Sequence, residues 1–358
     1  MISGNIVTPA IGKEAVMIVT IKDVAKRANV APSTVSRVIA NSPRISEQTK
    51  KRVREVMEEL GYHPNFQARS LAAKSTQAIG VIMPNSAYHA FQNPFFPEVL
   101  RGISTSAHAN KYGIYLSTGS TEDEIYNEVI SMVQGRRVDG IVLLYSRVND
   151  KTMNFLQKSN FPFVVVGRPY ENEERISFVD NDNIYSTKLV TNYLIQLGHR
   201  NIAFVGGSLH FVVTIDRLNG YKLALKEADI PFNEEYIVHE EYIKENGREA
   251  IHSLMSLPSP PTALVTQDDL IAYEMISHLE EINIRVPEDM SIVSFNNLML
   301  SEHSKPPITS VDICIYQLGF EATNCLIEKI KIPDTLPKRI TIPTKFIERK
   351  SCEQKISI

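Results

Sequence analysis

A short segment near the start of the chain carries side chains suited to reading the edges of DNA bases. Residues 32–37 read Pro-Ser-Thr-Val-Ser-Arg, so three small hydroxyl groups precede one arginine. A guanidinium group can donate two parallel hydrogen bonds to O6 and N7 of guanine, and serine or threonine hydroxyls can pair with either kind of base. Arg37 is therefore a candidate for recognising guanine, whereas Pro32 offers only an apolar surface, for example to a thymine methyl group.

A second group of basic residues lies further along the chain. It comprises Lys50, Lys51, Arg52 and Arg54, which are candidates for contacting phosphate. Residues 18–74 contain 11 Lys and Arg against 5 Asp and Glu, a net charge of +6. The whole chain has a net charge of −3 and residues 1–17 are balanced, so residues 75–358 carry −9. A basic segment on an acidic body indicates contact with a polyanion such as nucleic acid, although a solvated charged surface would have the same composition.

The elements that must position these side chains are short helices. Apolar residues recur at helical spacing in two stretches, which comprise Ile21, Val24, Ala25 and Ala28, then Val35, Val38 and Ile39. Thr20 is a candidate N-cap, Pro32 suits the first turn of the second helix, and Asn29 between them tolerates a left-handed conformation. A third helix is expected to be capped by Ser46 and to run to Gly61. This arrangement predicts a helix-turn-helix whose second helix presents the hydroxyls and Arg37.

Composition excludes several other classes of protein. With 43% hydrophobic and 22% charged residues, the chain is an ordinary globular protein. No apolar run is long enough to cross a bilayer and the first residues lack the pattern of a secretory signal, so no membrane partner is expected. Three cysteines without a CxxC pair do not suit a disulfide scaffold or a zinc site, and fit a reducing cytoplasm. No GxSxG, P-loop or GxGxxG motif appears and the nine histidines are scattered, so an enzyme is not expected.

Residues after about 77 alternate between apolar runs and amphipathic stretches. Runs at 79–83, 114–117, 140–144, 163–166, 177–179, 202–205, 263–265 and 292–295 are expected strands. Helices are expected at 95–110, 124–134, 151–158, 185–197, 215–228, 250–257 and 271–281. This alternation predicts parallel sheets covered on both faces, and a charged break at 171–175 divides them into two α/β lobes. A ligand cleft is expected beyond the carboxyl ends of the strands.

The chain resembles the lac repressor/gal repressor (LacI/GalR) family of bacterial transcription factors. The likeness is carried by Thr-Ile-Lys-Asp-Val-Ala at 20–25, Thr-Val-Ser-Arg-Val at 34–38, and Gly-Tyr-x-Pro-Asn-x-x-Ala-Arg-x-Leu at 61–71. It continues through the body in Asn-Pro-Phe-Phe at 93–96, Arg-Arg-Val-Asp-Gly-Ile at 136–141, Asp-Arg-x-x-Gly-Tyr at 216–221 and Pro-Pro-Ile-Thr-Ser-Val at 306–311. Ala31 and Asn29 depart from the usual Ser and Gly of the family.

The resemblance implies how the chain is divided. It implies an N-terminal extension at 1–16, an all-α helix-turn-helix head at 17–63, a hinge segment with a hinge helix at 64–76, and a tail at 351–358. Residues 77–350 would form a two-lobed, α/β, periplasmic-binding-protein-like effector domain, which also makes a homodimer. The chain would cross between lobes near residues 176, 310 and 340, with the second lobe spanning roughly 177–309.

The resemblance also implies site residues. DNA-binding positions fall on Thr20, Pro32, Ser33, Thr34, Ser36, Arg37, Asn41, Lys51, Asn65, Ala68 and Leu71. Two hinge segments of a dimer would each push Leu71 between base steps in the minor groove of a palindromic operator. Effector-binding positions fall on Phe95, Arg168, Arg217, Asp268 and Asn296. No cofactor or metal is implied.

These effector positions indicate a sugar, because an arginine, an acid and an amide beside an aromatic ring suit hydroxyl groups. The sequence Ser-Phe-Asn-Asn at 294–297 resembles that of maltose-operon repressors and favours maltose or a maltodextrin. Arg217 has the alternative of a salt bridge with Asp216 or another neighbour. A catabolite-control regulator, with a phosphorylated carrier protein as corepressor, remains the alternative function.

Overall fold

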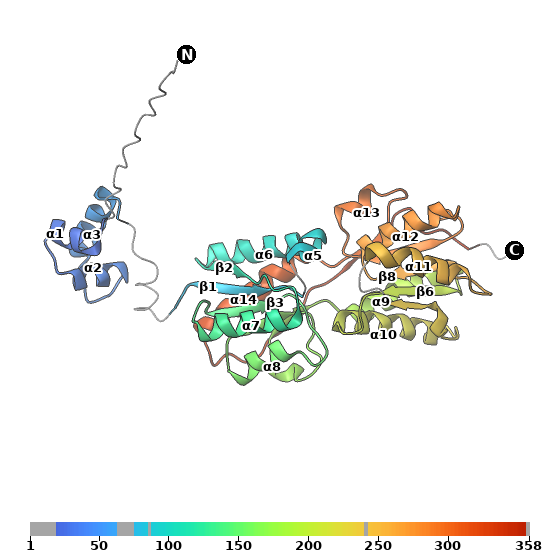
Figure 1. The fold of residues 1–358 in the computed structure, drawn as a ribbon, viewed down its shortest axis with the longest axis horizontal. Helices are drawn as coiled ribbons and strands as arrows, with labels where there is room; N and C mark the ends of the chain where they lie inside the picture. The colour runs from blue at the N-terminus through green and yellow to red at the C-terminus, as the bar shows by residue number, and fades with distance from the viewer. Residues whose placement is uncertain (1–18, 63–74, 85–86, 240–242, 356–358) are drawn as a thin grey trace, which may run out of the picture. The chain divides into compact units, whose positions relative to one another are not determined.

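The computed structural model describes residues 19–62, 75–84, 87–239 and 243–355. Its contacts divide the chain into two compact units that meet between Thr76 and Gln77. The units are described separately below (Figure 1).

The first unit is a three-helix bundle with its own core. It contains α1 (Ile21–Arg27), α2 (Pro32–Ile39) and α3 (Glu47–Glu59). The predicted inward faces of α1 and α2 pack against α3, and the core comprises Val24, Ala25, Ala28, Val35, Val38, Val53 and Val56. Asn29 has a left-handed backbone (φ 52°) and the Ser46 hydroxyl accepts a hydrogen bond from the Thr49 amide, as predicted. The helix-turn-helix prediction is confirmed.

The second unit contains two six-stranded sheets. The first has the order β11-β5-β4-β3-β1-β2 and every neighbouring pair is parallel. Its strands are β1 (Ala78–Ile82), β2 (Gly113–Leu116), β3 (Gly140–Leu143), β4 (Phe163–Val166), β5 (Phe178–Asp180) and β11 (Arg339–Thr341). Its helices are α5 (Ala87–Gln92), α6 (Phe95–Ala109), α7 (Glu122–Gln134), α8 (Lys151–Lys158) and α14 (Ile315–Lys331), with a 3₁₀ turn at Glu173–Arg175.

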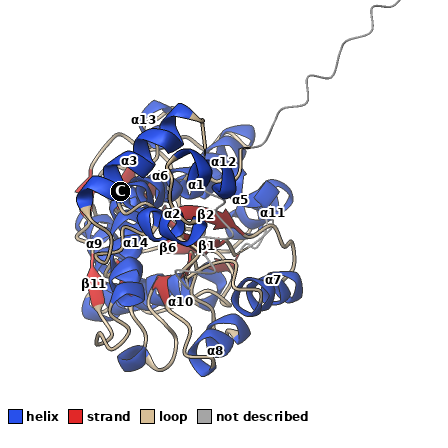
Figure 2. Cartoon of the chain, turned by 90° about the vertical axis from the view of Figure 1, so that its left-hand side faces the viewer, coloured by secondary structure: helices blue, strands red, loops and turns tan. Residues whose placement is uncertain are grey.

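Helices cover both faces of this first sheet. Figure 2 draws the helices of the chain in blue and its strands in red. Alternate strand residues point to opposite faces because the strand period is two. Val81 and Val142 therefore share a core with α6 and α14, while Ile82 and Ile141 share another with α7 and α8. Helices α6 and α14 approach closely at Gly102, where an added Cβ would lie 2.0 Å from the Tyr316 carbonyl oxygen.

The second sheet has the order β12-β10-β9-β8-β6-β7, and its β12–β10 pair is antiparallel. Its strands are β6 (Ile202–Gly206), β7 (Ile237–His239), β8 (Ala263–Thr266), β9 (Ser291–Phe295), β10 (Thr309–Asp312) and β12 (Lys345–Ile347). Its helices are α9 (Asn183–Gln196), α10 (Val212–Glu227), α11 (Ile243–Met255), α12 (Asp269–Glu281) and α13 (Met299–His303), with a 3₁₀ turn at Glu234–Tyr236. Helices α9 and α10 pack on one face, and α11 and α12 on the other.

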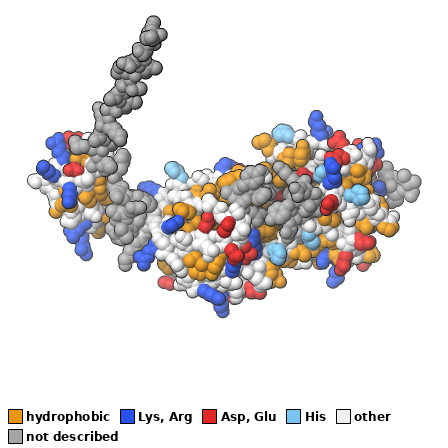
Figure 3. Space-filling model, viewed as in Figure 1, with side chains coloured by type: hydrophobic (Ala, Val, Ile, Leu, Met, Phe, Trp, Pro, Cys, Tyr) orange, Lys and Arg blue, Asp and Glu red, His pale blue; other side chains and the backbone are white. Residues whose placement is uncertain are grey.

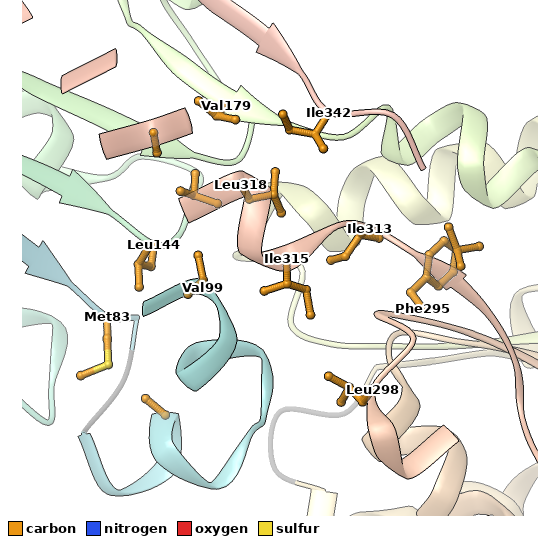
Figure 4. Packing of buried hydrophobic residues seen from close by; sticks show 14 of the residues in the cluster. Met83, Val99, Leu144, Val179, Phe295, Leu298, Ile313, Ile315, Leu318 and Ile342 are labelled. Atoms are coloured by element: carbon orange, nitrogen blue, oxygen red, sulfur yellow. The ribbon is translucent and has the colours of Figure 1, made fainter. Parts of the chain in front are cut away.

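The crossings between lobes lie a few residues later than the sequence predicted. The expected positions near 176 and 310 fall just before the observed ones, because Phe178–Asp180 pairs with β4 and Thr309–Asp312 pairs with β9. The chain crosses after Asp180, after Asp312 and after Thr341. Buried apolar residues continue from one lobe into the other at the middle crossing, where Ile313 and Ile315 lie between Phe295 and Leu318 (Figure 4).

The described part of the expected tail at 351–358 forms hydrogen bonds with the second lobe. Ser351 is buried, and its hydroxyl donates to the Ile292 carbonyl and accepts from the Thr309 amide. The Lys355 amide donates to the Leu197 carbonyl. Residues 351–355 thus satisfy backbone groups of the second lobe. No helix among the described residues is long and apolar enough to span a membrane.

Candidate functional site

Helix α2 presents the side chains that the sequence assigned to base recognition. Pro32, Ser33, Ser36 and Arg37 are exposed and Thr34 is half-buried, because Val35 and Val38 occupy the inward face. Lys and Arg side chains are visible along the left-hand edge of this unit in Figure 3. The helix has no side-chain cap at Ala31; Pro32 has no N–H to be capped, and the Thr34 amide donates to the Ala31 carbonyl at 2.8 Å.

In helix α3, one of the four side chains expected to contact phosphate is buried. Lys51 and Arg52 are exposed, but the Lys50 side chain is buried and its Nζ lies 2.7 Å from Glu47 Oε1. Lys50 therefore cannot reach phosphate as it stands. Arg54 donates from Nη2 to Asn41 Oδ1 at 3.0 Å, so these two exposed residues are paired.

Of the remaining predicted DNA contacts, the structure describes Thr20 but not the three in the hinge segment. Thr20 is exposed, and both its amide and its hydroxyl donate to Asp23 Oδ2, at 2.8 and 2.6 Å. Asn65, Ala68 and Leu71 lie outside the described residues.

A pocket of about 480 Å³ lies between the two lobes of the second unit. Four of the five predicted effector residues line it. Phe95 comes from the first lobe at the start of α6. Arg217, Asp268 and Asn296 come from the second lobe, in α10, before α12 and after β9 respectively. The carboxyl ends of β3, β8 and β9 meet here, as expected for parallel sheets.

Arg217 is the most buried cation of this pocket, with 4% of its surface exposed. Its Nε donates to Asn183 Oδ1 at 3.2 Å, its Nη1 donates to the Gln267 carbonyl, and its guanidinium lies 4.1 Å from the Phe295 ring centroid. Burial lowers the pKa of Arg217 to about 10, against the opposing attraction of Asp268 and Asp180. Arg217 therefore remains a cation at neutral pH.

Asp268 caps the N-terminus of helix α12 and also lines the pocket. Its Oδ1 accepts from the amides of Leu270 and Ile271 at the start of α12, and Asn93 Nδ2 of the other lobe lies 3.4 Å from its Oδ2. Burial raises its pKa, and the two amide bonds and Arg217 oppose that shift. Asn296 is buried with a positive φ of 96°, a conformation that asparagine tolerates better than most residues.

Comparisons with known proteins agree with both halves of this structure. Residues 20–65 match the family described as bacterial regulatory proteins, lacI family, and residues 191–352 match the periplasmic binding protein-like domain. The chain is 42% identical over 283 residues to the HTH-type transcriptional regulator MalR of Streptococcus pneumoniae, covering 79% of this chain and 84% of that protein. The chain belongs to the lacI family of bacterial regulatory proteins.

Other lacI-family proteins are similar over nearly the whole chain. MalR of Staphylococcus xylosus is 35% identical over 334 residues (93% and 98% coverage), and catabolite control protein A of Priestia megaterium is 34% identical over 336 residues (94% and 99%). These relatives are regulators and not enzymes.

Several solved structures are also similar to this chain. A LacI regulator from Bacillus cereus subsp. cytotoxis is 50% identical with a TM-score of 0.77 (78% and 99% coverage), and the CelR–cellobiose complex is 30% identical with 0.73 (93% and 99%). The lac repressor dimer bound to operator shares the fold at 23% identity, with a TM-score of 0.81 (94% and 99%).

Arg168 does not line the pocket of this lacI-family regulator. Its Nε and Nη2 donate to the two carboxylate oxygens of Asp216 at 3.1 and 2.7 Å, which joins the first lobe to α10 of the second. The carboxylate of Asp216 is thus engaged by Arg168, and the hydrogen bonds of Arg217 go to its other neighbours Asn183 and Gln267. Arg168 therefore connects the lobes and stands outside the ligand pocket.

Sequence reasoning missed several polar residues that line the pocket, and three of them closely follow strands. Ser146 and Arg147 follow β3, and Gln267 follows β8. The signal for all three was their position just after a buried strand, where the carboxyl ends of parallel strands gather ligand contacts.

Proposed function

We propose that this lacI-family regulator is a homodimeric repressor of a palindromic operator, controlled by a neutral, maltose-like sugar bound between its lobes. The observation that carries the proposal is the pocket itself, which both lobes line and in which a buried, rigidly held Arg217 lies beside Asp268 and Asn296. The names of the MalR relatives and the cellobiose bound by CelR support a sugar.

The charges around the pocket favour a neutral ligand. Two cations, Arg217 and Arg147, line it together with three acids, Asp180, Asp268 and Glu122. An unbalanced cationic pocket would be expected for a phosphorylated sugar, because a phosphate needs several uncompensated donors. A hydroxylated sugar needs mixed donors and acceptors with an apolar face, which these polar groups and Phe95 supply.

The proposed DNA contacts divide by role. Helix α2 enters the major groove with Pro32, Ser33 and Arg37 nearest the bases, while Lys51 contacts phosphate. The hinge segment, including Asn65, Ala68 and Leu71, contacts the minor groove. Since specificity comes from base contacts and general affinity from phosphate contacts, the two groups of variants have distinguishable effects.

The proposed regulation is a shift between lobe arrangements. A ligand held by both lobes stabilises the arrangement that it fits best, and can shift the equilibrium only by that difference in affinity. That arrangement separates the two hinge segments of the dimer, which then release the operator. A coupling free energy of about 1–3 kcal/mol would lower operator affinity roughly 5- to 150-fold.

The test is operator affinity at fixed salt, with and without maltose. Maltose is expected to weaken operator binding, and Arg217→Ala should abolish this response because the ligand loses its central donor. Tighter operator binding with a phosphorylated carrier protein, together with no effect of maltose, would replace the proposal by a catabolite-control function. The similarity to catabolite control protein A makes this the alternative to measure.

A further inference from the structure

Asn181 lies in the first of the three crossings between the lobes and contacts the other two. It directly follows β5, is buried and does not line the pocket. Its Nδ2 donates to the Ile313 carbonyl of the second crossing at 3.1 Å and to the Ile342 carbonyl of the third crossing at 2.9 Å. One side-chain amide therefore joins all three connections between the lobes.

Both carbonyls lie where the backbone has just left a sheet. Ile313 follows β10 and Ile342 follows β11, so the ladder hydrogen bonds of the sheets end before them. Both residues are buried (Figure 4). A buried carbonyl without a donor is costly, and asparagine offers two N–H groups on a short stem, whereas aspartate has none and serine has one hydroxyl. The residue type at position 181 thus matches the two acceptors that face it.

The first crossing is also attached to the floor of the pocket. Asn183, two residues after Asn181, accepts at Oδ1 from Nε of Arg217 at 3.2 Å. The Nδ2 of Asn183 donates to Asp180 Oδ1 at 3.1 Å. A shift of Arg217 on ligand binding therefore acts directly on the segment that contains Asn181.

The second crossing is attached to the same pocket by the loop that follows β9. Asn297 donates from Nδ2 to Asp312 Oδ2 at 3.3 Å. The amide of Asn296, which lines the pocket, donates to the Val311 carbonyl at 2.8 Å. The pocket is thus connected to two of the crossings, and Asn181 connects these two to each other and to the third.

These lateral hydrogen bonds affect how the lobes can move. Three separate connections can bend in many ways, because every residue of an irregular segment has two soft dihedral angles. When hydrogen bonds join the connections at one level, they bend together, and the lobes turn relative to each other about one axis. Without these bonds, part of the movement caused by a ligand would remain as local distortion within single crossings.

We infer that Asn181 is a positioning residue for regulation, which makes the three crossings act as one hinge. Through this hinge, sugar binding in the pocket reorients the first lobe as a whole, and Asn181 does this without touching sugar or DNA. Removing its two N–H groups should therefore leave sugar affinity almost unchanged while reducing the effect of sugar on operator binding. This inference rests on the proposed function.

The test compares sugar binding with the response to sugar in the full chain. Asn181→Leu keeps a similar side-chain volume and deletes both N–H groups. Calorimetric titration measures maltose affinity, and fluorescence anisotropy measures affinity for an operator selected with the unmodified chain, at fixed salt, with and without maltose. We expect maltose affinity to change less than about threefold, whereas the effect of maltose on operator affinity falls to less than about twofold.

Ser351→Ala is the matched control. Ser351 is also buried and its hydroxyl also makes two hydrogen bonds with backbone groups, but both of these groups belong to the second lobe. Its replacement should lower stability in urea unfolding, while the effect of maltose on operator affinity stays within about twofold of the unmodified chain. A loss of the response in Asn181→Leu alone is then not a general effect of lower stability.

Asn181→Ser is the milder variant if Asn181→Leu does not fold. Its one hydroxyl can donate to one carbonyl at most, so it joins at most two crossings and should reduce the maltose effect by at least about half. A folded variant that binds maltose and keeps the full effect on operator affinity overturns the inference and leaves the proposed function intact. A loss of maltose binding itself also overturns it, since Asn181 would then act on the pocket and not on the hinge. If the unmodified chain does not bind maltose, or if maltose does not weaken its operator binding, the proposed function is wrong and the inference falls with it.

Discussion

Replacing Arg168 by methionine should destabilise the second unit, because it leaves a buried carboxylate without its partner. Arg168 donates two hydrogen bonds to Asp216, whose side chain is 5% exposed, whereas that of Arg168 is 32% exposed. The hydrogen bonds that Arg168 donates to Asp216 raise the pKa of Arg168, against the opposing effect of its partial burial. Methionine preserves most of the apolar stem, so the loss is mainly that of the paired charge.

The magnitude follows from how far each partner is buried. Breaking a fully buried ion pair costs about 3–5 kcal/mol, and water around the partly exposed Arg168 reduces this, so we expect about 2 kcal/mol. Asp216→Asn should cost less, about 1 kcal/mol, because the arginine left behind is still partly hydrated. The coupling energy of the double-mutant cycle should be at least 1 kcal/mol, since the two groups contact each other directly.

Urea unfolding measured by far-UV circular dichroism is the assay, as the chain has no tryptophan to report by fluorescence. Arg285→Met is the matched control. Arg285 makes an equally bidentate pair with Asp289, at 2.8 and 3.1 Å, but both partners are exposed and belong to one lobe. Its loss should change stability little. If Arg168→Met is no more harmful than Arg285→Met, the ion pair does not hold the lobes together.

Three further predictions concern the helix-turn-helix, a buried acid and a helix contact. Arg37→Ala should relax sequence preference, whereas Lys51→Ala should weaken specific and non-specific DNA binding alike; equal losses of both in filter-binding or gel-shift assays with Arg37→Ala would contradict the assignment. Burial raises the pKa of Asp180 to about 6, so the folded state retains a proton that the unfolded chain releases. Stability should therefore fall by about 2 kcal/mol as pH rises from 4 to 6, and Asp180→Asn should remove this part of the slope in urea unfolding at several pH values. Gly102→Ala should destabilise the second unit by about 2 kcal/mol or more, because its Cβ would lie 2.0 Å from the Tyr316 carbonyl oxygen; an unchanged urea midpoint would show that α6 and α14 can separate freely.

Elements with clear boundary signals could be predicted to the residue. Helix α8 matches the expected 151–158 because Asp150 caps it, and β4 matches 163–166 because a continuous apolar run ends at Gly167. Helices α5, α13 and α14 and strand β10 were not anticipated, nor were the short strands β7, β11 and β12. The short strands lie at sheet edges, where exposed polar residues such as Arg339 and Thr341 break the apolar pattern.

The sequence could predict a residue of the candidate site only where the residue type and its position in the chain indicate which groups lie next to it. Helix α10 is buried on several sides, with Asp216, Arg217 and Leu218 all inaccessible. Its periodicity therefore could not tell which charged residue faces the pocket and which pairs with the other lobe. The partner of Asp216 comes from a loop 48 residues away, and such a contact depends on how the lobes meet.

The three crossings determine when each part of the chain can become functional during synthesis. The first sheet lacks α14 until residue 331 has been made, and the second lacks β12 and the bonds of Ser351 until later still. The three-helix unit has its own core and needs none of these segments. A nascent or truncated chain would therefore present a folded DNA-reading unit before any ligand pocket exists. A chain that ends before residue 339 would lack β11 of the first sheet and β12 of the second, so a single truncation would impair both lobes and leave the three-helix unit intact.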